Sequence, residues 1–343
     1  MTPIVSIIIL NLNGWKMTIE CLESLYQNSY NNYYVIVIDN GSQDNSVEEI
    51  KKYCLAQTIP PQSIYYTYDV TNKPINYTII TKNESENNSL FFISFKHLIV
   101  IKNESNYGFA EGNNIGIRFA LNTLQSDYIL TLNNDTIVDK DFLINLLKVA
   151  ERESNIGSCQ SKILSMKDPS FIDAVGINIS FYGSAYQVGY HQKDCGQYNN
   201  NLDIFGACAC SALYNSKMLK YVGLFDEDFF AYYEDVDLAW RARLYSWKTV
   251  YAHDSIVYHT GSSTGSRIKS YYCARNSLSY LIKNAPIHLV ILGICNFIRK
   301  IPFIIKAKYE MNMQHIWIDD SIIIHYMKML KKRKCCLKIN RIL

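Results

Sequence analysis

The sequence lacks any apolar run long enough to cross a bilayer, since none reaches the roughly 18 residues that a spanning helix requires. It also lacks the basic and apolar opening of a secretory signal peptide. Charged residues make up 19% of the chain and hydrophobic residues 48%, which argues against wholesale disorder. The net charge of +3 is too small to indicate a nucleic-acid partner. We therefore expect a folded cytoplasmic protein that binds no nucleic acid.

Several short motifs are missing as well. The ten cysteines include no Cys-x-x-Cys pair, so a structural zinc site is not predicted and reduced thiols are expected. No Gly-x-x-x-x-Gly-Lys-Ser/Thr stretch occurs, which excludes a P-loop. No Gly-x-Gly-x-x-Gly stretch occurs either, so a dinucleotide-binding fingerprint is unsupported.

Apolar runs alternate with helical patterns in the first half of the chain. The runs at 5–10, 34–38, 97–102 and 127–132 are typical of strands buried on both faces. The helical patterns between them indicate right-handed crossovers. We predict an α/β fold with a mostly parallel, twisted sheet and helices on both of its faces. In such sheets ligands bind at the carboxyl ends of the strands.

Three segments break this alternation. Residues 60–96 are rich in Asn, Thr, Tyr and Ser, and we predict an inserted loop or small hairpin on the surface. Residues 172–190 are aromatic and glycine-rich and predict a hairpin, while 202–214 predict a further strand. We expect the last two to form a small antiparallel addition.

Polar residues follow the predicted strands where they end. Asn11 and Asn13 follow the first strand, Asp39 the second and Asp135 the fourth. Asp39 closes an apolar strand and is suited to accept hydrogen bonds from a base or a ribose. Asp135 is suited to hold a divalent ion that neutralises a diphosphate, although a helix-capping role is the alternative.

A turn rich in glycine and asparagine, residues 106–116, precedes another predicted helix. Asn106, Gly108 and Asn114 lie in it. Glycine permits close backbone approach, and a helix N-terminus attracts phosphate or hydroxyl groups. The turn is therefore a second candidate for ligand binding.

The segment 223–243 holds six carboxylates and six aromatic residues. We predict an extended aromatic run, 229–233, followed by a helix whose first turn contains Glu234, Asp235 and Asp237. Stabilisation of the helix dipole accounts for Asp237. Two adjacent carboxylates beside aromatic surface are better explained by a desolvated general base with a raised pKa.

Two further features lie towards the C-terminus. Two short strands are predicted after the carboxylate cluster, at 249–252 and 255–259. His259 ends the second, and it is either a metal ligand or a structural histidine. Apolar helical patterns at 286–298 and 316–330 are followed by cations, including the run 331–334. Such helices suit an anionic membrane surface, and packing against the rest of the protein is the alternative.

Taken together, these motifs resemble the inverting family-2 glycosyltransferases with the GT-A fold, especially the rhamnosyltransferase-like branch. The resemblance covers about residues 4–286. The segments that carry it, in order, are VSIIILNLNGW (5–15), VIVIDNGSQDNS (35–46), NYGFAEGNNIGI (106–117), YILTLNNDTIV (128–138), GLFDEDFFAYYEDVDLAWR (223–241), IVYHTGSS (256–263) and YYCARNSLSYLIKNAP (271–286).

The resemblance implies a role for each matching residue. Asp235 would be the general base, and Asp135 and His259 would bind Mg²⁺ or Mn²⁺. The nucleotide-binding residues would be Asn11, Asn13, Asp39, Asn106, Gly108 and Asn114. The acceptor side or the leaving group would be served by Glu234, Asp237, Arg241 and Arg275. One departure concerns the triplet at 133–135, Asn-Asn-Asp, which has a single carboxylate where the family's Asp-x-Asp motif has two.

The expected function is transfer of a sugar from a nucleotide-diphosphate donor, with dTDP-rhamnose as one candidate, to a hydroxyl of a glycan or lipid-linked acceptor. We expect a catalytic domain over 1–268 and a helical extension over 269–343 that rests on the inner face of the cell membrane. The absence of Gln-x-x-Arg-Trp disfavours a processive synthase. Alternatives are a non-catalytic nucleotide-sugar-binding protein and a nucleotidyltransferase, although the latter normally needs a basic glycine-rich loop that the first strand does not supply.

Overall fold

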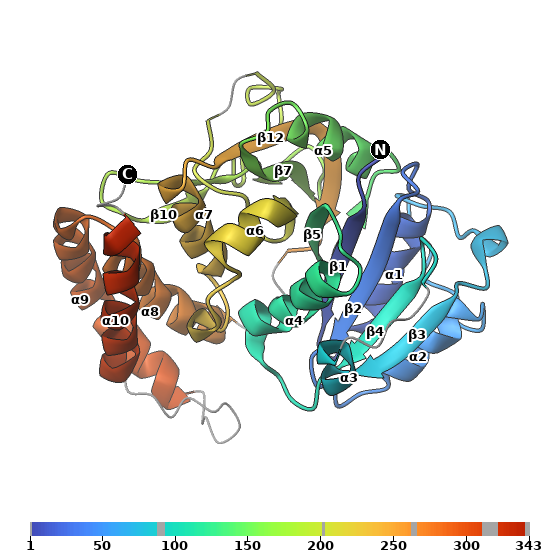
Figure 1. Cartoon of the computed structure of the whole chain (residues 1–343), viewed down its shortest axis with the longest axis horizontal. Helices are drawn as coiled ribbons and strands as arrows, with labels where there is room; N and C mark the ends of the chain where they lie inside the picture. The colour runs from blue at the N-terminus through green and yellow to red at the C-terminus, as the bar shows by residue number, and fades with distance from the viewer. Residues whose placement is uncertain (1, 88–92, 201–202, 262–265, 311–321, 340–343) are drawn as a thin grey trace.

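The computed structural model describes residues 2–87, 93–200, 203–261, 266–310 and 322–339, and a ten-stranded sheet lies at its centre (Figure 1). Its strands run in the order β3-β4-β2-β1-β5-β11-β7-β12-β6, and β8 pairs with β7 beside this path. The bounds are β1 Val5–Asn11, β2 Tyr33–Asp39, β3 Tyr77–Thr81, β4 Leu98–Lys102, β5 Tyr128–Asn133, β6 Thr136–Val138, β7 Ile156–Ser165, β8 Ile172–Ala174, β11 Ser211–Asn215 and β12 Lys248–His259.

The sheet is mostly parallel, as predicted. β3, β4, β2, β1 and β5 are parallel neighbours, and β7 is parallel to β12. β11 lies antiparallel between β5 and β7, and β6 and β8 are the other antiparallel strands of the sheet. The predicted hairpin in 172–190 is present as β9 (Ile177–Ile179) and β10 (Ala185–Gln187).

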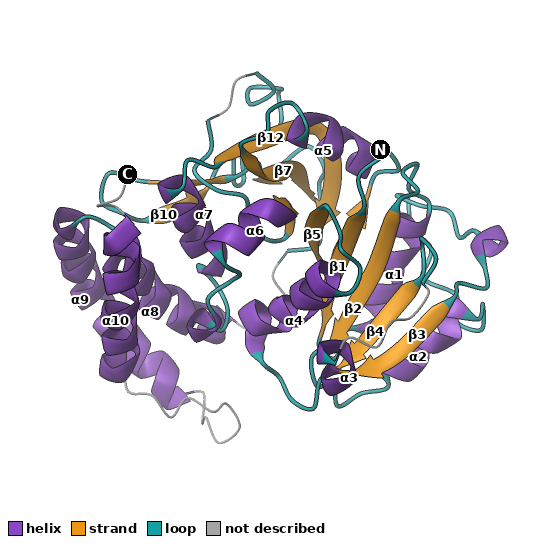
Figure 2. Cartoon of the chain, in the orientation of Figure 1, coloured by secondary structure: helices purple, strands orange, loops and turns teal. Residues whose placement is uncertain are grey.

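Helices cover both faces of the sheet (Figure 2). Alternate residues of β1 explain this: Ile7 and Ile9 belong to a core with α1, α2 and α5, whereas Ile8 belongs to a core with α4 and α6. Strands buried on both sides therefore read as continuous apolar runs. The helices concerned are α1 Trp15–Tyr26, α2 Ser46–Cys54, α4 Gly108–Asn122, α5 Phe142–Ala150 and α6 Ser216–Val222.

The segment 60–96 is not the surface loop or hairpin that we predicted. It contains a short 3₁₀ helix η1 (Val70–Asn72), β3 and a short helix α3 (Lys82–Glu86). β3 pairs with β4 in parallel and forms the edge of the sheet. Most of its residues are partly exposed, so this edge strand carries Thr and Tyr instead of the apolar run that marks a central strand.

Two other predictions are corrected in the second half. The predicted strand 202–214 is shorter, because among its described residues the backbone joins the sheet only from Ser211. The two short strands predicted at 249–252 and 255–259 form a single strand, β12, with an irregularity between Ala252 and Ile256. That interruption in pairing is the physical reason that the pattern read as two pieces.

The C-terminal helices pack together beside the sheet (Figure 1). They are α7 Glu234–Leu244, α8 Ser266–Asn284, α9 Ile287–Glu310 and α10 Ile322–Ile339. Residues 316–321 of the second predicted tail helix, like the loop at 262–265, lie outside the described residues. Among the helices that the structure describes, none has the length and apolar character needed to cross a membrane.

Candidate functional site

A chain of hydrogen bonds links the carboxyl ends of β2, β1 and β5. Asn11 donates from Nδ2 to Asp39 Oδ1 over 2.9 Å, and both side chains are buried. Thr18 on α1 donates to Asn11 Oδ1 over 2.9 Å and accepts from Asn134 Nδ2 over 3.1 Å. This chain runs from Asp39 to the residue directly before Asp135, so two of the predicted sites lie along one edge of the sheet.

Asn13 lies at the exposed rim of this edge with a left-handed φ of 52°. Its Oδ1 accepts from the backbone N–H of Gln43 over 2.7 Å, and its own N–H donates to Ser42 Oγ over 3.0 Å. Asn13 therefore ties the loop after β1 to the loop after β2.

His259 bridges two carboxylates at the end of β12. Its Nε2 lies 3.2 Å from Asp135 Oδ1, and its Nδ1 lies 2.8 Å from Asp173 Oδ2 on β8. The antiparallel pairing of His259 with Thr136 brings the neighbouring Asp135 alongside it. Burial by itself lowers the pKa of His259, but the Cys210 thiol and the two carboxylates outweigh burial and raise that pKa far above its usual range.

The Asp135–His259 pair has the spacing of two adjacent ligands of one ion. Two atoms that each lie about 2.1 Å from an octahedral ion, at right angles, are about 3 Å apart. Asp173 contacts the other ring nitrogen of His259, Nδ1, as the outer carboxylate does in carboxylate–histidine–metal sites. Within the described ranges, no group of three or more His, Cys, Asp or Glu side chains has the spacing of a metal site. Asp135 and His259 could therefore supply two ligands to a divalent ion.

Asp235 reaches the same edge from the first turn of α7. Its Oδ2 accepts from the backbone N–H of Ala209 over 3.2 Å. The next residue, Cys210, accepts with its carbonyl from the N–H of Asn133 over 2.9 Å, and its thiol lies against His259. Asp235 and the Asp135–His259 pair are thus connected through two consecutive residues that lead into β11.

The adjacent carboxyl groups at the start of α7 have different surroundings. Glu234 is buried, and its Oε2 has no hydrogen-bond partner in the part of the chain that is described. Burial and then the charge of Asp235 raise the pKa of Glu234 well above its usual range. Burial also raises the pKa of Asp235, but the N–H groups of Ala209 and Val236 favour its ionised form. The pair therefore holds one neutral acid beside one partly exposed carboxylate that accepts a proton readily.

The aromatic run before α7 is not extended, contrary to our prediction. It begins with the 3₁₀ helix η2 (Glu227–Phe229), and Phe230, Tyr232 and Tyr233 then have φ values of 62°, 68° and 71°. Arg275 donates to the carbonyl of residue 229, and Asn276 donates to the carbonyls of residues 229, 231 and 232. The strained backbone is therefore held from α8, and Arg275 points at the peptide chain there.

The turn before α4 is engaged by this same segment. The carbonyl of Phe230 accepts from the N–H groups of residues 109 and 110, over 2.6 and 3.0 Å. Gly108 has a φ of 81°, and a Cβ added there would lie 2.6 Å from the Phe230 ring. The N-terminus of α4 is thus capped by a protein carbonyl, which corrects the prediction that it attracts phosphate. Asn106 caps the turn through Gly108 N–H, and buried Asn114 exchanges two hydrogen bonds with the backbone of Phe225.

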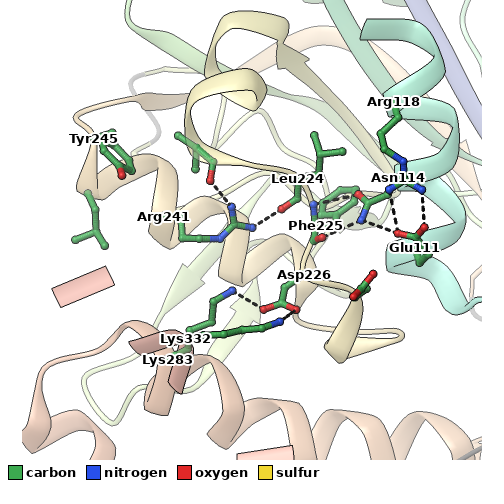
Figure 3. Close-up of a pocket in the computed structure, with 13 residues that line it drawn as sticks. Glu111, Asn114, Arg118, Leu224, Phe225, Asp226, Arg241, Tyr245, Lys283 and Lys332 are labelled. Atoms are coloured by element: carbon green, nitrogen blue, oxygen red, sulfur yellow. Dashed lines mark hydrogen bonds and ion pairs between the residues drawn. The ribbon is translucent and has the colours of Figure 1, made fainter. Parts of the chain in front are cut away.

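Asp237 and Arg241 belong to a buried ion network. Figure 3 shows its members Arg241, Asp226, Lys283 and Lys332. Asp237 Oδ2 accepts from Arg241 Nε and from Lys283 Nζ on α8, each over 2.8 Å. Lys283 also pairs with Asp226 over 2.7 Å, and Lys332 of α10 reaches Asp226 over 2.5 Å. The Arg241 Nη atoms donate to the carbonyls of residues 222–224. The network fastens α7, α8 and α10 together.

A pocket of about 540 Å³ opens above this network, between α4, α7 and α10 (Figure 3). It includes Asn114 and Arg241, whereas Asp39, Asp135 and Asp235 do not line it. Each of its cations Arg118, Arg241, Lys283 and Lys332 is paired with a carboxylate. It is therefore a gap at a helix junction, separate from the edge where the other predicted residues meet.

Sequence reasoning missed three residues that organise the site. Asp173 supports His259, Thr18 joins Asn11 to Asn134, and Lys283 neutralises the buried carboxylates behind α7. Asp173 offered a signal, because a lone carboxylate stands between apolar Ile172 and Ala174. No local pattern marks Thr18 or Lys283.

Comparisons with known proteins agree with this architecture. Residues 6–72 match the model of glycosyl transferase family 2, and residues 94–276 match that of glycosyltransferase-like family 2. The low-salt glycan biosynthesis hexosyltransferase Agl10 of Haloferax volcanii is 24% identical over 170 residues, which are 48% of this chain and 52% of that protein. The match thus spans about half the length of this relative.

Solved structures share the fold. The mannosyltransferase PcManGT from Pyrobaculum calidifontis, solved with GDP-Man and Mn²⁺, aligns with a TM-score of 0.54 and 12% identity over 99% of this chain and 86% of its own. GalNAc-T7, solved with UDP, GalNAc and Mn²⁺, aligns with a TM-score of 0.56 and 11% identity over 82% of this chain and 48% of its own. The GT-A fold predicted from the sequence is confirmed. The second family model matches more than half of this chain, and the chain therefore belongs to glycosyltransferase-like family 2.

Proposed function

We propose that this protein is an inverting, metal-assisted glycosyltransferase that moves a sugar from a nucleoside diphosphate to a hydroxyl of a glycan or lipid-linked acceptor. One observation carries the proposal. The partly exposed carboxylate of Asp235 is connected, through Ala209 and Cys210, to the edge of the sheet that holds Asp135 and His259. A base and a diphosphate-binding pair thus lie within one site.

In this proposal Asp235 takes the proton of the acceptor hydroxyl while the oxygen attacks the anomeric carbon in line with the departing diphosphate. Its raised pKa suits a base, because proton transfer is most efficient when the pKa approaches the working pH. Glu234 stays neutral beside it and adds no competing charge. The edge formed by Asn11, Asn13 and Asp39, with Asn106 next to it, borders the nucleotide.

A divalent ion, Mg²⁺ or Mn²⁺, would be held by Asp135 Oδ1 and His259 Nε2. When bound, such an ion stabilises negative charge that develops on the leaving diphosphate. The Mn²⁺ in PcManGT and GalNAc-T7 supports this assignment. The single carboxylate of the Asn-Asn-Asp triplet leaves more of the ion's shell to the donor.

The proposed donor class is a nucleoside diphosphate sugar. Resemblance to the rhamnosyltransferase-like branch favours dTDP-rhamnose, whereas PcManGT was solved with GDP-Man and GalNAc-T7 with UDP and GalNAc. We keep 1–268 as the catalytic domain and 269–343 as its helical extension, with a cytoplasmic site. Arg241 and Arg275 are then positioning residues, since their guanidinium groups hold backbone carbonyls of the segments before α7.

A panel of sugar nucleotides tests the function directly. Thermal unfolding of the protein is followed with each donor, with and without Mn²⁺ or Mg²⁺. We expect one donor to raise the melting temperature in a concentration-dependent way, because a ligand that binds only the folded state stabilises it by mass action. Slow release of nucleoside diphosphate should be measurable with that same donor. A panel in which donors bind without any release or transfer would favour the non-catalytic alternative.

Replacing Asp173 tests the metal site. We expect Asp173→Ala to weaken Mn²⁺ binding about 10–100-fold, because loss of an outer carboxylate frees the ring and lowers the basicity of the ligand. Electron paramagnetic resonance of free Mn²⁺, titrated without donor, measures this. Asp168→Ala is the matched control, since the exposed carboxylate of Asp168 lies in the same region and accepts its two side-chain hydrogen bonds from the neighbouring Ser170. Equal Mn²⁺ affinity in both variants would contradict the role of Asp173.

A further inference from the structure

Helix α9 presents a continuous apolar stripe to solvent. Ile287, Ile291, Ile294, Ile298 and Ile301 are 37–66% exposed. Their spacing of four, three, four and three residues places them on one face of the helix. The stripe spans fifteen residues, and the fourteen helical rises between its ends make it about 21 Å long. Exposed apolar patches of this size and regularity mark surfaces that bind a partner.

The opposite face of α9 fixes the stripe in place. Val290 is buried, and Leu289 and Phe297 pack against the same core as α8. A Cβ added to Gly293 would lie 2.5 Å from Leu281 Cδ1, so glycine permits α9 to approach α8 closely. The stripe thus points away from a packed interface.

The C-terminal sequence that carries the stripe is predominantly basic. From residue 286 to the C-terminus the sequence has eleven Lys and Arg against three Asp and Glu, a net charge of +8, whereas the whole chain carries +3. The rest of the chain is therefore negative. The sequence of α9 has no acidic residue before Glu310, and α10 has none. Arg299 on α9 and Lys331 on α10 are exposed.

We infer that this face of α9 docks onto an anionic lipid bilayer, with the isoleucine stripe in the interfacial region and the cations against lipid headgroups. A helix that inserts an apolar stripe into the interface and carries cations beside it binds such surfaces through apolar burial and through attraction to anionic lipids. A second copy of the chain would bring two basic C-terminal segments together. The inference narrows the contact that the sequence suggested to α9, since two residues of the basic run on α10 are engaged internally. Lys332 pairs with Asp226, and Arg333 donates to the carbonyls of Ile282 and Ala285.

The experiment uses the full chain and vesicles of phosphatidylcholine, with or without phosphatidylglycerol. We expect the protein to sediment with the mixed vesicles, and the double variant Ile291→Ser/Ile298→Ser to lose about tenfold or more in partition coefficient. Ile59→Ser/Ile64→Ser is the matched control, because both side chains are exposed far from α9 in the sequence. Circular dichroism confirms that each variant folds.

Three results would overturn the inference: no binding of the native protein to mixed vesicles, equal binding by the stripe variant, or a native dimer that the stripe variant converts to a monomer. A fourth result, equal binding to vesicles of pure phosphatidylcholine, would contradict the electrostatic part of the inference. The readout needs no donor or acceptor, so its failure is distinguishable from failure of the proposed transfer activity.

Discussion

We expect Asp235→Asn to lose nearly all sugar transfer while it still binds the donor. An amide has the size of the carboxylate but cannot take the acceptor proton, and a general base contributes about 10²–10⁴-fold to the rate. The amide oxygen can still accept from the N–H of Ala209, while the N–H of Val236 loses its side-chain acceptor, so the start of α7 keeps one of the two bonds. The measurement is kcat for the identified donor and acceptor, alongside the melting-temperature shift that the donor produces.

Glu234→Gln is the control for this variant. Because burial and the charge of Asp235 raise the pKa of Glu234 well above its usual range and so favour its neutral form, glutamine reproduces the size and the favoured charge of this side chain. We expect Glu234→Gln to retain most of the activity and Asp235→Asn almost none. Normal turnover by Asp235→Asn, or an equal loss in both variants, would remove Asp235 from the role of base.

The two carboxyl groups also fix the direction of the pH effects. Activity needs ionised Asp235, whose pKa is raised, so the rate should fall as the pH drops through that raised value. Glu234 has a higher pKa in the folded than in the unfolded chain, so its contribution to stability is fully present below the unfolded pKa and is lost as the pH rises through the folded value. Glu234→Gln should therefore gain stability relative to the native protein at alkaline pH.

The strands that form the centre of the sheet were predictable because burial on both faces leaves a plain apolar signature. Val5–Asn11 and Tyr33–Asp39 read as strands, and polar residues at their ends marked the edge where Asn11 and Asp39 meet. In a parallel sheet the carboxyl ends of the strands lie at one edge, so the shared position of these residues could be predicted without contact information. The edge strand β3 was not predicted, since a partly exposed strand lacks the apolar run that marks a central strand.

Residues that act through distant partners were not predictable in the same way. Asp237 sits in an acidic cluster beside Asp235, yet its side chain turns to Lys283, 46 residues later, and away from the site edge. Asn114 matched a ligand-binding turn but bonds the backbone of Phe225, 111 residues later. Aromatic residues seldom adopt positive φ values, so the residue types at Phe230 and Tyr232 do not predict the left-handed backbone that both have. Tertiary contacts decide these orientations.

Lys283 is the residue whose loss should cost the most stability. Lys283 is 5% exposed, and its ammonium group pairs with Asp226 over 2.7 Å and Asp237 over 2.8 Å. Lys283→Met keeps the length of the side chain but leaves two buried carboxylates with less compensation. Removing one partner of a buried ion pair costs about 3–5 kcal/mol. We expect a loss near the lower end of that range, since Arg241 and Lys332 still contact the carboxylates.

Lys248→Met provides the matched control for burial. Lys248 makes a 2.6 Å pair with Glu153, but both side chains are about half exposed. Exposed pairs contribute about 0–1 kcal/mol, so this variant should unfold almost like the native protein in urea. A similar free energy of unfolding for the two variants would show that the Lys283 network does not fasten α8 to α7.

The pH dependence separates lost charge pairing from lost packing. Burial by itself raises the pKa of Asp237, but Lys283 and Arg241 outweigh it and lower that pKa. A lowered folded pKa stabilises the protein above the unfolded value, about 4, and that contribution disappears as the pH falls through the folded value. The deficit of Lys283→Met should therefore be largest near neutral pH and shrink in acid, where the carboxylates take up protons. A deficit that stays constant from neutral to acidic pH would mean that the methionine packs poorly, whatever its effect on charge.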